Sequence, residues 1–354
     1  MNKINKIYLS LGKACNMACS YCIQGGHQKQ IEQKLANAEL KRLVSFFPKD
    51  YKCEVIFFGG EPLLYWEDMH KLAYYLKEHN PLISLNTVSN GTLLTKNKAK
   101  ILNEMGIKFR LSHDGHYYER SRGIKDILKI NPEPYLTLEN RGIASVISRE
   151  NYNFYDIWGY FDNFVLKHGI SRKESVYIKH VEDAENNTPV DLFIYEMPEY
   201  EAMLDMVFAN MEKNILEGDF DCYEFKQYEP FLVGLNHRLN NPHSICAMCG
   251  GDKYNVHMDV QGNIYTCHNV EKPYTTAQKE GRLLTGNYNP YINTETCKNC
   301  IAFVVCGGGC VSCDPTKKKF SCYITKQEYT RIVKMLDNIG QKGGLAYDQY
   351  NYSV

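Results

Sequence analysis

Short apolar runs and longer helix-like stretches alternate from residue 7 to about residue 216. The apolar runs have the length and composition of buried strands and lie at 7–11, 54–59, 83–88, 107–112, 143–148 and 175–180. The helix-like stretches include 37–47, 66–79, 95–105, 152–168 and 199–216, and 116–141 predicts one helix and a loop. Repeated β–α units predict a parallel sheet covered by helices. Because six units fall short of the eight in a closed barrel, the sequence predicts an α/β fold, a partial (β/α)6 TIM barrel open on one side.

Polar motifs follow the first four predicted strands, at the point where each strand ends. They are "CNMACSYC" (15–22), "GGEP" (59–62), "SNG" (89–91) and "SHDG" (112–115). The carboxyl ends of barrel strands are where α/β barrels build their active sites. The sequence therefore predicts one site that several strands supply.

The 14 cysteines are clustered: three lie at 15–22 and nine lie between 246 and 322. Cys53 and Cys222 stand apart, and we expect both to be structural thiols. The chain shows neither a signal peptide nor an apolar run of the ~18–20 residues that a membrane span needs. We therefore expect a cytoplasmic protein with no membrane partner, in which clustered cysteines indicate metal or redox chemistry. Lys+Arg and Asp+Glu both number 41, and this balance gives no sign of nucleic-acid binding.

The spacing of "CNMACSYC" places three thiolates on one short loop. They could hold three corners of a [4Fe–4S] cubane and leave its fourth iron without a protein ligand; zinc with a distant ligand such as His27 is the alternative. Together with "GGEP" after the second strand, the motif resembles the radical S-adenosylmethionine (SAM) superfamily over nearly the whole chain. The resemblance implies that Cys15, Cys19 and Cys22 hold a cluster whose open iron binds SAM. Cleavage of SAM would then give a 5′-deoxyadenosyl radical that abstracts hydrogen from the substrate.

The same resemblance implies contacts between the protein and SAM. Tyr21 matches the position that packs on the adenine, although ordinary core packing would also explain it. Gly59, Gly60 and Glu61 match the segment that receives the SAM ammonium group, where glycines allow close backbone approach and a carboxylate suits a cation.

Two further positions extend the predicted SAM site. Ser112, in "SHDG", matches a position that contacts polar groups of SAM in related maturases. Arg122 is the candidate cation for the SAM carboxylate, because a guanidinium can pair with it bidentately. Arg120 could serve instead, and a solvated surface arginine is an equally good reading of either residue.

The chain after about residue 235 is Gly-rich and Cys-rich, and two zinc sites would be compatible with its spacings. The string that includes Gly262–Cys267 and "CKNCIAFVVCGGGC" (297–310) instead resembles the SPASM extension, which carries two auxiliary [4Fe–4S] clusters. The resemblance implies that the first is bound by Cys246, Cys249, Cys267 and Cys310, and the second by Cys297, Cys300, Cys306 and Cys322. Cys313 is left over and could replace a neighbour. With the SAM cluster, the resemblance implies three [4Fe–4S] clusters.

These observations divide the chain into three predicted parts. Residues 1–234 would form the radical SAM partial barrel, 235–325 a loop-rich SPASM domain, and 326–354 the C-terminal end. A closing helix is predicted at 323–338, followed by a flexible tail.

The run from "GGEPLL" to "VISRENY" resembles the maturases of peptides and of anaerobic sulfatases most closely. Two departures argue against sulfatase maturation: Phe58 stands where glutamine is common, and His268 stands where an aspartate is the proposed base. His268 could still act as a general base, and a hydrogen-bonded structural histidine fits equally well. The cysteine loop begins at residue 15, leaving no room for an N-terminal peptide-binding domain, so leader recognition would fall to the barrel, the extension or a separate protein.

The predicted function is that of a radical SAM/SPASM peptide maturase that crosslinks or oxidises a residue of a peptide or protein. Such an enzyme would need an external electron donor of the flavodoxin or ferredoxin type. The alternatives are an anaerobic sulfatase-maturating, formylglycine-forming enzyme, a radical SAM dehydrogenase of a small molecule, and a zinc-stapled binding module without enzymatic activity.

Overall fold

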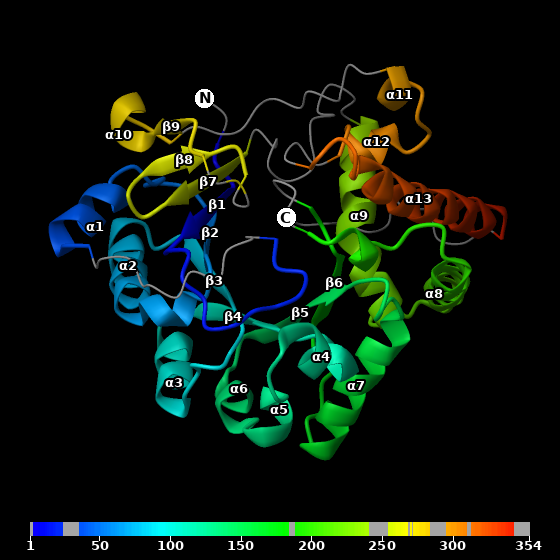
Figure 1. Cartoon of the computed structure of the whole chain (residues 1–354), viewed down its shortest axis with the longest axis horizontal. Coiled ribbons are helices and arrows are strands. Elements are labelled where there is room, and N and C mark those ends of the chain that lie inside the picture. The colour runs from blue at the N-terminus through cyan, green and yellow to red at the C-terminus, as the bar shows by residue number, and fades with distance from the viewer. Residues whose placement is uncertain are drawn as a thin grey trace.

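A computed structural model describes residues 3–23, 35–183, 188–240, 254–267, 270, 272–283, 295–309 and 313–342, with side chains 237–240 excepted. The described strands form one sheet in the order β6-β5-β4-β3-β2-β1-β7-β8-β9 (Figure 1). Their bounds are β1 Lys6–Ser10, β2 Cys53–Phe58, β3 Ile83–Ser89, β4 Ile107–Ser112, β5 Arg141–Ile147, β6 Val176–His180, β7 Asn255–Asp259, β8 Asn263–Tyr265 and β9 Thr275–Thr276. From β6 to β7 all neighbours are parallel, whereas β7, β8 and β9 are antiparallel. The six predicted strands and the open, partial barrel are confirmed.

Helices cover the outer side of the arc that β1 to β6 form (Figure 1). The longer ones are α1 Asn37–Val44, α2 Trp66–His79, α3 Lys96–Glu104, α7 Phe154–Lys167, α8 Pro198–Glu217, α9 Tyr223–Asn240 and α13 Lys318–Gln341. The shorter α-helices are α4 Tyr118–Arg122, α5 Ile127–Ile130, α6 Glu133–Thr137, α10 Ala277–Glu280, α11 Glu295–Lys298 and α12 Phe303–Cys306. Single 3-10 turns are η1 Pro62–Tyr65, η2 Gly115–Tyr117 and η3 Val190–Leu192.

The segment 116–141 differs from the prediction of one helix and a loop. It forms η2, α4, α5 and α6, because breakers stand at short intervals. Gly123 ends α4 in the left-handed conformation at φ 70°, and Asp126 caps the next turn by accepting a hydrogen bond from Leu128 N.

Alternation along each strand separates two faces of the sheet. On β1, Ile7 and Leu9 are buried in the core against the outer helices, whereas Lys6, Tyr8 and Ser10 are half-buried on the inner side of the arc. The same period of two runs through β2, where Val55 and Phe57 are buried. The hydrophobic core therefore lies between sheet and helices, and the inner face is free for a site.

The C-terminal part of the chain is more regular than the sequence suggested. α9 was not predicted, and β7 extends the barrel sheet by pairing with β1 from Lys6↔Asn255 to Ser10↔Asp259. The closing helix is confirmed, but α13 begins earlier than expected. The domain boundaries stay predictions; the boundary at 234/235 falls inside α9 and the boundary at 325/326 falls inside α13.

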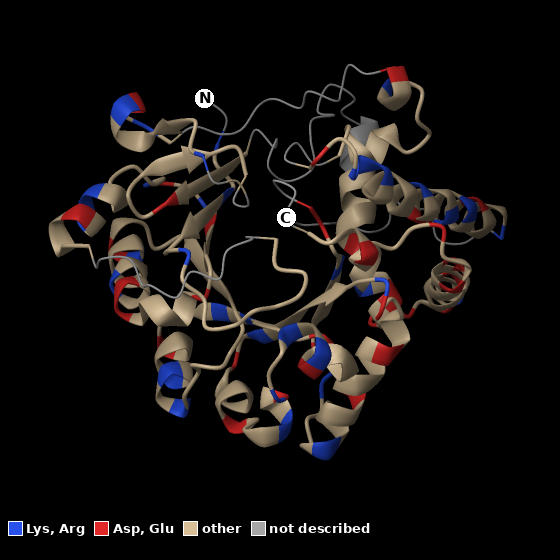
Figure 2. Cartoon of the chain, viewed as in Figure 1, with Lys and Arg blue, Asp and Glu red and all other residues tan. Residues whose placement is uncertain are grey.

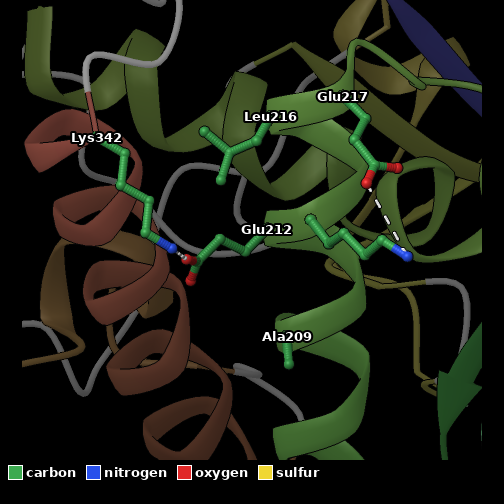
Figure 3. A pocket seen from close by; sticks show the side chains of 6 residues that line it. Ala209, Glu212, Leu216, Glu217 and Lys342 are labelled. Atoms are coloured by element: carbon green, nitrogen blue, oxygen red, sulfur yellow. Dashed lines mark hydrogen bonds and ion pairs between the residues drawn. The ribbon is translucent and has the colours of Figure 1, made fainter.

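α13 packs along α8 through polar contacts. Arg331 Nε lies 2.7 Å from Asp205 Oδ1, and the Tyr323 hydroxyl donates to Glu201 Oε1 at 2.6 Å. Near their far ends Lys342 lies 2.8 Å from Glu212 Oε1, beside a cavity of about 340 Å³ (Figure 3).

Among the described helices, none combines the length and apolarity needed to cross a membrane.

Candidate radical SAM site

The loop that carries Cys15, Cys19 and Cys22 follows β1 and lies inside the arc of strands (Figure 1). The three thiols are half-buried. Burial raises the pKa of Cys19 to about 11; the neighbouring thiols of Cys22 and Cys15 add to this rise, and Arg122 opposes it. The pKa values of Cys15 and Cys19 are raised by burial and by the neighbouring Cys22 thiol, which fits a metal cluster, because bound iron would stabilise the thiolates. Among the described residues, no three His, Cys, Asp or Glu side chains are placed to hold a single metal ion.

The glycines of "GGEP" fit the loop after β2 onto the cysteine loop. Gly60 N donates to Gly12 O at 2.9 Å, and Glu61 N donates to Ala14 O at 2.8 Å. A Cβ on Gly59 would lie 2.2 Å from Gly12 O, and one on Gly60 would lie 2.1 Å from Ala14 O. These positions therefore require glycine for backbone contact between the two loops, whatever part they take in binding SAM.

Glu61 is 1% exposed and ties the end of β2 to the end of β3. Its Oε1 accepts hydrogen bonds from Leu63 N at 2.9 Å and from Ser89 Oγ at 2.6 Å, and its Oε2 accepts one from Asn90 N at 2.8 Å. Burial raises the pKa of Glu61, and these hydrogen bonds oppose the rise. Asn90 in turn donates to Asn16 Oδ1 at 2.9 Å, so the carboxylate also supports the cysteine loop.

Asp114, which sequence reasoning did not single out, gathers four donors in the "SHDG" turn. It accepts hydrogen bonds from the Tyr21 hydroxyl at 2.5 Å, from Ser121 Oγ at 2.7 Å and from Val146 N at 3.0 Å. Arg122 donates to both of its oxygens, at 2.9 and 3.2 Å. Burial raises the pKa of Asp114, but Arg122 and the other donors outweigh this and hold it below its usual value.

The two candidate arginines lie in different surroundings. Arg122 is buried between the rings of Tyr21 and Tyr118, whose centroids are 5.6 and 5.7 Å from its Cζ, and its Nη1 lies 3.9 Å from Cys19 Sγ. Arg120 is mostly exposed and pairs with Glu150 at 2.5 Å. Arg122 is therefore the arginine placed beside the cysteine loop, with Asp114 rather than solvent around its charge.

The remaining predicted residues of this site lie at the same end of the sheet. Ser112 is the last residue of β4 and is half-buried. Tyr21 directs its hydroxyl to Asp114 and packs beside Phe320 and Phe193. These contacts alone would account for Tyr21 as a packing residue, and a contact with adenine stays a prediction.

His113, also missed from the sequence, fixes the same turn. Its Nδ1 accepts from Gly115 N at 3.2 Å, so Nε2 carries the proton and donates to Asp126 Oδ1 at 2.9 Å. Burial lowers the pKa of His113, which keeps the ring neutral. No spacing rule could have found this pair, because Asp126 follows only after an intervening helix.

Three of four neighbouring distal cysteines lie near one lysine. Cys297, Cys300, Cys306 and Cys322 are half-buried. Burial raises the pKa of Cys306 to about 11, and the thiols of Cys322 and Cys297 contribute to the rise. Burial also raises the pKa of Cys322, with further contributions from Cys297 and Cys300. Lys318 Nζ lies 3.9 Å from Cys297 Sγ and lowers the pKa of both Cys306 and Cys322.

The first predicted auxiliary set is described only in part. Cys267 is 3% exposed and Cys313 is 5% exposed. Cys246, Cys249, Cys310 and His268 lie outside the described residues.

Residues 9–138 match the family model of the radical SAM superfamily. The chain therefore contains a radical SAM domain and is an enzyme of the radical SAM type, as the motifs predicted. Such a domain implies one [4Fe–4S] cluster and SAM as cofactors.

Two curated relatives match most of the chain. The radical SAM cyclopropyl synthase TigE of Paramaledivibacter caminithermalis is 24% identical over 95% of this chain and 75% of its own length. A cysteine-type anaerobic sulfatase-maturating enzyme of Clostridium perfringens is 22% identical over 92% of this chain and 96% of its own length.

Two solved structures share the fold. Native anSMEcpe with bound AdoMet and a Cp18Cys peptide superposes with a TM-score of 0.67 at 20% identity, covering 95% of this chain and 99% of that one. Streptococcus suis SuiB bound to its precursor peptide SuiA superposes with a TM-score of 0.59 at 15% identity, covering 88% of this chain and 72% of that one. The likeness confirms the predicted fold class.

Proposed function

We propose that this chain is a radical SAM peptide maturase that crosslinks or oxidises a residue of a peptide or protein. The proposal rests chiefly on the cysteine loop, which lies inside an open barrel rather than on its outer surface. An open side suits a substrate too large for a closed pocket. Structural neighbours that bind peptides add support.

In this proposal Cys15, Cys19 and Cys22 hold the cluster that binds SAM. Cluster and SAM, when bound, supply a 5′-deoxyadenosyl radical that abstracts hydrogen from the substrate. The segment Gly59–Glu61 would fit the loops together beside the SAM ammonium, and Ser112 would contact SAM polar groups. Tyr21 and Arg122, which both donate to Asp114, would lie at the adenine and carboxylate sides.

The chain would also carry a SPASM extension with two auxiliary [4Fe–4S] clusters. Cys322 and Cys297 contribute to the raised pKa of Cys306, and Cys297 and Cys300 contribute to that of Cys322, which supports the assignment of these four thiols to one cluster. Cys246, Cys249, Cys267 and Cys310 would bind the other, and His268 is a candidate general base. A flavodoxin or ferredoxin would supply electrons in the cytoplasm, with leader recognition by this chain or a separate protein.

Anaerobic reconstitution followed by iron and sulfide analysis tests the cofactor assignment. Three cubanes require about twelve irons and twelve sulfides per chain. The triple Cys→Ala variant at 15, 19 and 22 should abolish SAM cleavage and keep about two-thirds of the iron, if the auxiliary sites fold independently. A zinc protein without visible absorbance would contradict the proposal.

Mass spectrometry of a peptide encoded beside the gene and co-expressed with the enzyme tests the reaction. A loss of about two hydrogens indicates a crosslink or an oxidation. Conversion of cysteine to formylglycine, which replaces sulfur by oxygen and also removes two hydrogens, would instead identify a sulfatase maturase. The match to the Clostridium relative, which covers 92% of this chain and 96% of that enzyme, favours the sulfatase alternative. Phe58, which stands where glutamine is common in sulfatase maturases, argues against it. An unchanged peptide together with turnover of a small molecule would point to a dehydrogenase.

A further inference from the structure

The inner face of the barrel carries a group of cations. By the alternation along β1, β4 and β6, the side chains of Lys6, Lys108, Arg110 and Lys179 lie opposite the buried residues that face the helices. We call these four residues the inner basic face. Lys108, Arg110 and Lys179 are exposed, and Lys6 is half-buried. Figure 2 shows blue segments on several strands of the arc.

Carboxylates on this face are already engaged. Within the described strands β1 to β8, the alternation places only Glu54 and Asp259 on the same side. Glu54 Oε2 lies 2.8 Å from Lys6 Nζ, and its Oε1 accepts from Asn86 Nδ2. Asp259 accepts from Asn263 and from the Tyr265 hydroxyl within its own hairpin.

Lys108 and Arg110 have no carboxylate within ion-pair distance among the residues that the structure describes. Burial lowers the pKa of Lys6, but Tyr8 and Glu54 outweigh this and raise it overall; Arg110 is close enough for its charge to oppose that rise. Like charges that are gathered on a concave face raise the local concentration of anions there.

A hollow beside these cations has room for an anionic group. A cavity of about 180 Å³ at the amino ends of β4 and β5 is lined by Lys108, Arg110 and Arg172, with Glu139 as the carboxylate at its border. β5 contributes Gly142 opposite Arg110, so β5 itself places no side chain beside that arginine. Ser175 borders this position, with its carbonyl oxygen 3.1 Å from the place of a Cβ on Gly142.

We propose that the inner basic face binds a carboxylate side chain of an acidic peptide substrate, an inference that rests on the proposed peptide maturation. Four residue steps separate Lys108 from Ser112 on β4, a span of about 13 Å at the usual strand rise of ~3.3 Å per residue. An extended peptide covers that length in about four residues as well. The bound acidic residue therefore lies about four or five residues from the one that reacts near the cysteine loop.

Fluorescence anisotropy with two short labelled peptides, one of alternating Glu and Gly and one of alternating Gln and Gly, tests this on the anaerobic holoenzyme. The Glu/Gly peptide should bind more tightly, and added salt should weaken it selectively. The double variant Lys108→Gln/Arg110→Gln should bind it about tenfold more weakly, because charge-assisted hydrogen bonds are lost. Lys100→Gln, which changes an exposed lysine on α3, is the matched control.

A charge swap keeps the test independent of any damage to the fold. The variant Lys108→Glu/Arg110→Glu should prefer a Lys/Gly peptide over the Glu/Gly peptide. Equal binding of the Glu/Gly and Gln/Gly peptides by the parent enzyme, or an equal response of Lys100→Gln and the double variant, would overturn the inference. Binding needs no turnover, so absence of SAM cleavage would overturn the proposed function and leave this result standing.

Discussion

Arg122 holds Asp114 with two nitrogens and places its third, Nη1, 3.9 Å from Cys19 Sγ. One buried ion pair thus joins the turn after β4 to the loop that carries the three cysteines. Tyr21, inside that loop, donates to the same carboxylate. The geometry of the cluster loop therefore depends on a residue that would not itself touch iron.

Asp114→Asn should reduce stability by about 3 kcal/mol, because it leaves Arg122 buried without its counter-ion. We also expect less iron to remain at the first cluster. Anaerobic denaturant unfolding and iron analysis measure the two effects. The control is Arg120→Gln, which removes an exposed pair worth at most about 1 kcal/mol. Similar losses in the two variants would show that Asp114 does not hold the loop.

Gly60→Ala should displace the cysteine loop, because the added Cβ would lie 2.1 Å from Ala14 O. The expected result is loss of about one-third of the iron, the share of one cluster in three. Gly159→Ala is the matched control: it lies within α7 with open space around it, and should stabilise the helix by up to about 1 kcal/mol. Full iron content in Gly60→Ala would contradict the close approach of the two loops.

Lys318→Met should lower the reduction potential of the cluster assigned to Cys297, Cys300, Cys306 and Cys322. A nearby cation stabilises the more negative, reduced state of the cluster. Its removal should therefore lower the reduction potential by on the order of tens of millivolts. Redox titration followed by electron paramagnetic resonance measures the shift. Lys318→Arg, which keeps the charge, should leave the potential close to that of the parent. A shift of equal size in both variants would assign it to packing instead.

The stability of the folded chain should depend on pH through the buried Glu328. It is packed against Tyr228, whose hydroxyl donates at 2.9 Å, and against His180 at 3.8 Å, and burial raises its pKa to about 7. Because the folded pKa lies above the unfolded value, the stability that protonation supplies is fully present at low pH and is lost as the pH rises toward and through 7. His180 titrates in the opposite sense, since burial lowers its pKa to about 4.

Comparison with Glu328→Gln isolates the glutamate, because His180 is present in both proteins. From pH 5.5 to 8 the parent should lose about 2 kcal/mol of stability relative to the variant. Denaturant unfolding across this range measures the difference. Parallel pH profiles for the two proteins would show that Glu328 does not titrate as its burial requires.

The barrel strands could be predicted because each is a short, largely apolar run between helical stretches, in which every second residue is buried against the helices. The partnership of β7 with β1 could not, because "NVHMD" is short and its partner is some 250 residues away in the chain. α9 escaped prediction because Pro230 interrupts its helical pattern.

The candidate site was predictable where a motif has fixed spacing, as for Cys15, Cys19 and Cys22. Asp114 and His113 belong to the motif "SHDG", from which only Ser112 was predicted as a site residue. Their partners Arg122, Tyr21 and Asp126 come from other parts of the chain. Hydrogen bonds of this kind depend on tertiary packing and produce no periodic pattern of residues in the sequence. The choice between Arg120 and Arg122 likewise required their burial to be known.

The position of β1 between β2 and β7 also bears on how the chain folds as it is synthesised. When the first 234 residues have left the ribosome, β1 would still expose one unpaired edge, since its second neighbour begins only at Asn255. An unpaired edge is prone to join other chains. The newly made barrel is thus exposed to aggregation until β7 pairs with β1, and a fragment cut at the predicted boundary would remain permanently in that state.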